Sequence, residues 1–113
     1  MSNPTKVVFT LPTTNSDGTA LDPANITGIK LEILDSQGKV ESTTVVEKAN
    51  LNLDSAGNGF ILLPTLPNGS YSVVLLTEAV SQGVAVESVA SPSVPFVIVI
   101  PSIPNPPVAV SVV

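Results

Sequence analysis

Oxygen-bearing side chains in two glycine-containing loops are the residues of this sequence best suited to chemistry. Asn15, Asp17 and Asp22 share one loop, and Asp54 and Asn58 share another. Ca²⁺ takes carboxylate and amide oxygens as ligands, but a loop of the EF-hand type also ends in a bidentate Glu, which neither loop has. Asp and Asn beside Gly are also the ordinary residues of tight turns. Turn formation is therefore the favoured interpretation, with Asn15, Asp17 and Asp22 kept as candidate Ca²⁺ ligands.

The side chains that most enzymes use for catalysis are missing. The sequence has no His, Cys, Arg or Trp, and its only cationic side chains are Lys6, Lys30, Lys39 and Lys48. These lysines lie on or beside stretches in which they suit solvent-facing positions, so none is favoured as the base for a Ser or Thr nucleophile. We expect a protein that is not an enzyme and has no cofactor. Four cations against nine acids also lack the basic surface that nucleic-acid binding requires.

The composition predicts a single domain with an unusually apolar surface. Only 12% of the 113 residues are charged, 43% are hydrophobic and the net charge is −5, with a mean hydropathy of +0.46. A typical soluble domain has about 25% charged residues. No basic start followed by an apolar run marks a signal peptide, and no apolar stretch is long enough to cross a membrane. We therefore expect synthesis in the cytoplasm, without export and without a membrane anchor.

The elements that must position these residues are β-strands. Eleven prolines, seven glycines and many Val, Ile and Thr argue against helices. Apolar residues on both faces predict a central strand at 71–77, whereas alternation too weak for a central strand predicts an edge strand at 39–48. The other predicted strands are 6–11, 29–33, 60–63 and 96–100. Turn signals every 8–12 residues between short strands are typical of a β-sandwich.

Three stretches, taken in order, resemble parts of one module family. In residues 9–21 an aromatic, Phe9, precedes a Pro-Thr-Thr-Asn-Ser-Asp-Gly run, as in the second strand and following loop of fibronectin type III modules. Residues 66–73 resemble the tyrosine corner that opens the family's sixth strand, with Tyr71 as the tyrosine. Residues 83–92 resemble the loop before the seventh strand.

The chain is thus similar to the fibronectin type III, or Ig-like, modules of bacterial and phage proteins over roughly residues 6–100. The resemblance implies an all-β fold, an antiparallel β-sandwich with an extended C-terminal strand. It also implies that Phe9, Tyr71 and Phe96 lie in the core or at its corner.

One departure from the family concerns its first strand. That strand precedes the core aromatic, and with the aromatic at position 9 the chain leaves no room for it. Residues 105–113 instead look like the Pro-led first strand of a module whose body does not follow. We therefore divide the chain into a sandwich at 1–100, a Pro-rich linker at 101–107 and a C-terminal strand at 108–113.

The C-terminal strand presents an apolar face made by Val108, Val110 and Val112, and residues 88–113 carry no charged side chain. The strand could complete a neighbour's sheet, complete its own sheet, or be ordered by packing alone. An extended linker of seven residues spans about 22 Å, and a seven-residue strand rises about 23 Å. Because the family's seventh strand ends at the pole opposite the start of its first strand, exchange with a neighbour is favoured over self-completion.

We expect a non-catalytic structural protein that assembles through its C-terminal strand. The resemblance favours a phage virion component, such as a capsid decoration or minor capsid protein or a tail or head-completion subunit. Its partners would be proteins, either further copies in a homo-oligomer or other virion proteins, with no nucleic acid or membrane. The alternative is a bacterial surface adhesion or carbohydrate-associated module, located at the cell surface, for which an export signal and exposed aromatic residues would be expected.

Overall fold

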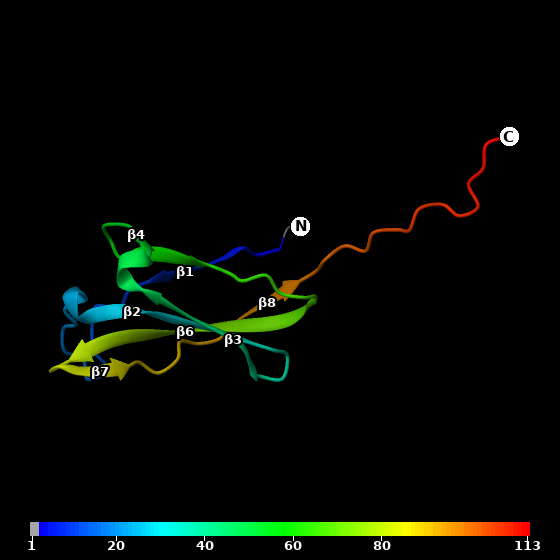
Figure 1. Cartoon of the computed structure of the whole chain (residues 1–113). Helices are drawn as coiled ribbons and strands as arrows, with labels where there is room; N and C mark the ends of the chain where they lie inside the picture. The colour runs from blue at the N-terminus through cyan, green and yellow to red at the C-terminus, as the bar shows by residue number, and fades with distance from the viewer. Residues whose placement is uncertain (1–2) are drawn as a thin grey trace.

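The computed structural model describes residues 3–113, which form two antiparallel β-sheets (Figure 1). One sheet has three strands in the order β1-β5-β4, and the other has β3-β2-β6-β7, with β8 also paired to β6. The strands are β1 (Lys6–Thr10), β2 (Ile26–Leu34), β3 (Val40–Glu47), β4 (Asn52–Leu53), β5 (Asn58–Leu62), β6 (Gly69–Ser81), β7 (Val84–Glu87) and β8 (Val94–Ile98). Two 3-10 helices of three residues each, η1 (Pro23–Asn25) and η2 (Lys48–Asn50), lie in the connections. Neither is long and apolar enough to cross a membrane. The all-β prediction is confirmed.

β2 and β6 form the centre of the five-stranded sheet, and each directs a row of apolar side chains into the core. On β2, Ile29, Leu31 and Ile33 point into the core, and on β6 Tyr71 and Val73 do the same. β2 is paired along its length with β3 on one side and with β6 on the other. β3 pairs only with β2, so the prediction that it forms an edge is confirmed.

The core lies between the two sheets and is buried unevenly. Leu31 and Ile33, from the five-stranded sheet, are 0% exposed. From the three-stranded sheet only Ile61 is buried, while Val7 and Phe9 are half-buried against the same cluster. The two sheets therefore share one core, and the three-stranded sheet covers its side of it less completely.

Tyr71 joins this core to the loop before β6. Its hydroxyl donates a hydrogen bond to the carbonyl oxygen of Pro67 at 2.8 Å, and its ring stacks on that of Phe96 with centroids 5.6 Å apart. A tyrosine hydroxyl bonded to backbone a few residues upstream is the geometry of a tyrosine corner. Tyr71 is buried, and Phe9 and Phe96 pack half-buried against the cluster.

The last strand lies two residues earlier than the predicted 96–100. The difference arises directly after β8, where the backbone of Val99 and Ile100 bonds to side chains and not to a neighbouring strand. The Asn3 side chain donates to the Val99 carbonyl at 2.9 Å and accepts from the Val99 amide at 3.0 Å. The Asn68 side chain accepts a hydrogen bond from the Ile100 amide. These amide side chains therefore end the ladder at Ile98.

Residues 101–113, the arm, extend away from the sandwich (Figure 1). The chain consequently measures 80 × 31 × 23 Å along its principal axes. The expected strand at 108–113 is not formed in this single chain, because the segment pairs with no strand of the described residues. Self-completion is therefore not the arrangement in the structure, whereas docking on a neighbour stays a prediction.

Candidate assembly surface

No strand among residues 3–113 pairs with the outer side of β1, and we call this side the open edge. β1 pairs with β5 on its other side only. Just outside the strand, the Thr5 carbonyl and the Leu11 amide both bond to the β5 side at 2.9 Å. Odd-numbered residues thus direct their backbone groups to β5. Because alternate residues of a strand direct theirs to opposite edges, the N–H and C=O groups of Lys6, Val8 and Thr10 point to the open edge.

Apolar side chains flank the open edge on both faces of the sheet. On the inner face, Val7 and Phe9 are half-buried beside the edge. On the outer face, Val8 is 69% exposed and lies opposite Phe60 of β5. The Lys6 ammonium stands 5.0 Å from the centre of the Phe60 ring. A strand added at this edge would cover both sets of side chains.

The other outer strands are shielded by features that proteins commonly use to protect sheet edges. β4 is only two residues long. β8 carries Pro95 at its second position, which has no N–H to offer. β3 carries Glu41 and Glu47, and the four-residue β7 ends at Glu87. The open edge of β1 has one charged residue, Lys6 at its start, and is the least shielded of them.

The arm is the second feature without a partner in the single chain. Its candidate assembly residues Val108, Val110 and Val112 are 88%, 78% and 100% exposed. Ile103 is 88% exposed as well, and no residue after Glu87 is charged. Exposed apolar segments of this kind mark surfaces that bind another protein or a membrane.

The loop that holds the candidate Ca²⁺ ligands uses its oxygens within its own turns. The Asp17 carboxylate accepts hydrogen bonds from the amide (3.0 Å) and hydroxyl (2.6 Å) of Thr19, and these bonds, the hydroxyl's first, lower the pKa of Asp17. The Asn15 side-chain amide donates to the Thr19 hydroxyl at 3.0 Å. Asp22 accepts from the Ala24 amide at 3.0 Å and so caps η1. These contacts are those of turn formation.

The second acidic loop is built in the same way. The Asp54 carboxylate accepts from the amides of Ala56 at 2.8 Å and Asn58 at 2.9 Å. The bond from the Asn58 amide is the largest of the effects that lower the pKa of Asp54. Among residues 3–113, no three acidic side chains gather as a metal site would need.

A pair of acidic side chains that the sequence analysis missed lies on the outer face of the five-stranded sheet. Glu78 of β6 is the register partner of Glu87 of β7, and Glu87 lies 3.4 Å from the Lys30 ammonium of β2. A hydrogen bond between the two carboxyls, together with burial and the charge of Glu87, raises the pKa of Glu78. The same hydrogen bond and Lys30 lower the pKa of Glu87.

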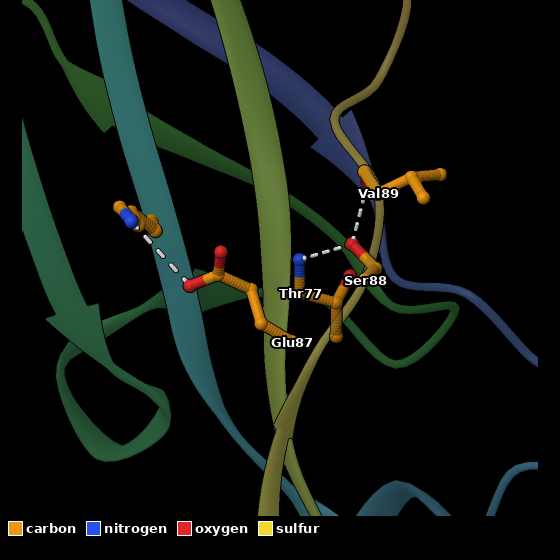
Figure 2. A network of polar contacts seen from close by, with 5 residues as sticks. Thr77, Glu87, Ser88 and Val89 are labelled. Atoms are coloured by element: carbon orange, nitrogen blue, oxygen red, sulfur yellow. Dashed lines mark hydrogen bonds and ion pairs between the residues drawn. The ribbon is translucent and has the colours of Figure 1, made fainter.

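The chain beyond this pair stays attached to β6 through two serines, whose backbone amides donate to the carbonyls of Thr77 and Leu75 at 2.9 Å and whose side chains also bind β6. Ser88 Oγ accepts a hydrogen bond from the Thr77 amide at 2.8 Å and donates to the Val89 carbonyl at 2.8 Å (Figure 2). Ser91 Oγ accepts likewise from the Leu75 amide at 2.9 Å. The hydroxyls thus act as acceptors for β6 amides between β7 and β8, beside the backbone bonds, so this side of β6 is occupied along most of its length.

Three of the four lysines have specific contacts. Lys30 pairs with Glu87, Lys6 stands over Phe60, and the Lys48 ammonium donates to the carbonyl of Pro23. Each of these contacts joins segments that are distant in sequence.

Comparison of the chain with protein-family models, curated protein sequences and solved structures finds no match. Within residues 3–113, the least shielded strand edge is the open edge of β1, and the apolar arm is the segment that extends away from the sandwich.

Proposed function

We propose that this chain is a non-catalytic structural protein that assembles with other subunits through its arm. The observation that carries the proposal is the exposure of an uncharged, Val-rich segment that projects from a folded sandwich (Figure 1). Burying apolar surface is favourable by about 25 cal/mol per Å². A neighbour that covered Val108, Val110 and Val112 would therefore be stabilised by burial that the single chain does not have.

The proposal also assigns the sandwich to the fibronectin type III kind. The two facing sheets, the Tyr71–Pro67 hydrogen bond and the aromatic residues packed on one core support the assignment. The placement in a phage virion, as a decoration, minor capsid, tail or head-completion subunit, follows from the resemblance to modules of the phage kind. It is an analogy at the level of the fold.

The aromatic residues disfavour the alternative of a carbohydrate-binding or adhesion module. Sugar-binding surfaces of that kind present exposed aromatic rings, and this chain has only three Phe and one Tyr. Tyr71 is buried, and Phe9, Phe60 and Phe96 are all half-buried. No aromatic ring is therefore offered as a flat exposed platform.

The native mass of the protein tests the proposal. Size-exclusion chromatography with light scattering is expected to give a mass well above 11.5 kDa, which falls to the monomer when residues 105–113 are deleted. A full-length chain with Val108, Val110 and Val112 all changed to Asp is the matched control for the loss of chain length, and it should behave like the deletion. A full-length protein that stays a monomer at all concentrations would overturn the proposal, as would a deletion variant that keeps the oligomeric mass.

A further inference from the structure

We infer that the receptor for the arm is the open edge of β1 in a second copy of the chain, where residues 108–112 add as an antiparallel strand. The inference rests on the proposed function and names the surface through which it works. The sandwich and the arm then complete one another in a head-to-tail contact, which closes into a ring or continues as a filament.

The direction of the arm favours a neighbour over its own sandwich. The Asn3 side chain binds the backbone of Val99, so the arm starts at the pole of the sandwich where β1 begins (Figure 1). An arm that folded back would have to reverse and would run parallel to its own β1. A copy stacked beyond this pole in the same orientation presents the far end of β1 first, and the outgoing arm then runs antiparallel to it.

The length of the arm fits this arrangement. Residues 101–107 span about 22 Å when extended, which allows them to leave one sandwich and pass the end of the next. The next five residues rise about 17 Å as a strand, and β1 is itself five residues long. The arm is therefore long enough for one linker and one strand of matching length.

The alternation of side chains sets the register. Inward-facing residues of paired strands must lie opposite one another, so Val108, Val110 and Val112 belong beside the inward Val7 and Phe9. Placing Val110 opposite Phe9 puts Val112 opposite Val7. The valines of the added strand would then cover the inner face of β1, where Val7 and Phe9 are half-buried.

On the opposite face, the same register pairs Ser111 with Val8 and Ala109 with Thr10. These small residues fit the exposed outer face, and the N–H and C=O groups of Val8 face the backbone of Ser111. Because residues 88–113 are uncharged, the added strand brings no charge against the apolar inner face.

A proline at the open edge tests the receptor. The Val8 amide points away from β5, so Val8→Pro removes no hydrogen bond of the sandwich, while it deletes the donor that the arm needs and places a ring in its path. We expect Val8→Pro to lose the assembled mass and Val8→Thr, which keeps the amide, to retain it. Mixing Val8→Pro with the triple Asp variant of the arm should give a 1:1 pair and nothing larger, because one chain can only donate and the other can only accept.

Cysteine cross-linking gives an independent measurement should Val8→Pro fold poorly. The chain has no cysteine, so a chain with Val8→Cys and Ser111→Cys should form intermolecular disulfides under mild oxidation, since paired residues lie within disulfide reach. A chain with Thr44→Cys on β3 and Ser111→Cys is the matched control and should not cross-link above background.

The outcomes separate this inference from the proposed function. If Val8→Pro assembles as the unmodified chain does, or if Thr44→Cys cross-links as well as Val8→Cys, the open edge is not the receptor, although the arm still drives assembly. If the unmodified chain is a monomer at every concentration, the proposed function fails and this inference fails with it. Protection of the 108–112 amides from hydrogen exchange in such a monomer would identify self-completion.

Discussion

The two sheets of the sandwich face the same core but bury it to different extents. Leu31 of β2 has a paired strand on each side and is 0% exposed. Val7 and Phe9 of β1 have a neighbour on one side only and stay half-buried. Both strands pack against the opposite layer, so the difference comes from neighbours within the plane of the sheet. The outermost strand of the narrow sheet is therefore the place where an added strand would bury the most.

The largest effect is expected at the centre of the wide sheet. Leu31→Ala removes a fully buried side chain and should lower the free energy of unfolding by about 3 kcal/mol. Leu63→Ala, at a half-buried position directly after β5, is the matched control and should cost about 1 kcal/mol because less surface is lost from the core. Urea unfolding followed by circular dichroism measures both, and equal losses would contradict the unequal burial of the two sheets.

A matched pair of valines tests β1 itself. Val73→Ala, at a site 6% exposed on β6, should cost about 2 kcal/mol, and Val7→Ala on β1 about 1 kcal/mol. Both variants are best compared in the chain whose arm carries the three Asp substitutions, where the open edge stays uncovered. In the assembling chain the cost of Val7→Ala should rise toward that of Val73→Ala. An unchanged cost there would show that assembly does not cover β1.

The smallest effect is expected on the outer face of the wide sheet, at Glu78. Its pKa is raised, so the ionised form is disfavoured by folding, and stability increases as the pH falls toward the ordinary value of 4.5. Glu78→Gln removes this penalty and should raise the Tm at pH 7 by about 2 °C, with the gain vanishing near pH 4. The control Glu87→Gln should lower the Tm at pH 7. The pKa of Glu87 is lowered in the folded protein, so its ionised carboxylate stabilises the fold at pH values above the ordinary pKa of 4.5. A gain from Glu78→Gln that persists at pH 4 would show that the raised pKa of Glu78 is not its cause.

The centre of the wide sheet is predictable from the sequence because inward apolar residues recur at every second position of β2. Ile29, Leu31 and Ile33 are separated by residues that face the other side, and this pattern defines an inward face without reference to the rest of the chain. The edge position of β3 follows from its mixture of Thr, Ser and Glu. The arm can be predicted from composition alone, because it is apolar and lies in a stretch without charged side chains.

What the sequence analysis missed depends on register and on side-chain hydrogen bonds. β6 continues past Thr77 to Ser81 and turns through Gln82 and Gly83, both at positive φ, into β7. Only this turn places Glu78 opposite Glu87, and a Gln-Gly pair within a run of weak alternation was the one available signal. The sequence pattern does not predict the end of β8 either, because the side chain of Asn3, nearly a hundred residues earlier, binds the backbone of Val99 there.

The hydrogen bonds of Asn3 and Asn68 have a mechanical consequence. They hold Val99 and Ile100 at the base of the arm, one from the segment that leads into β1 and the other from the loop that leads into β6. A pulling force on the arm is thereby divided between the two layers before it reaches β8. Tension from a neighbouring subunit would have to break these side-chain bonds, which connect the base of the arm to both layers, before it could peel the last strand from its sheet.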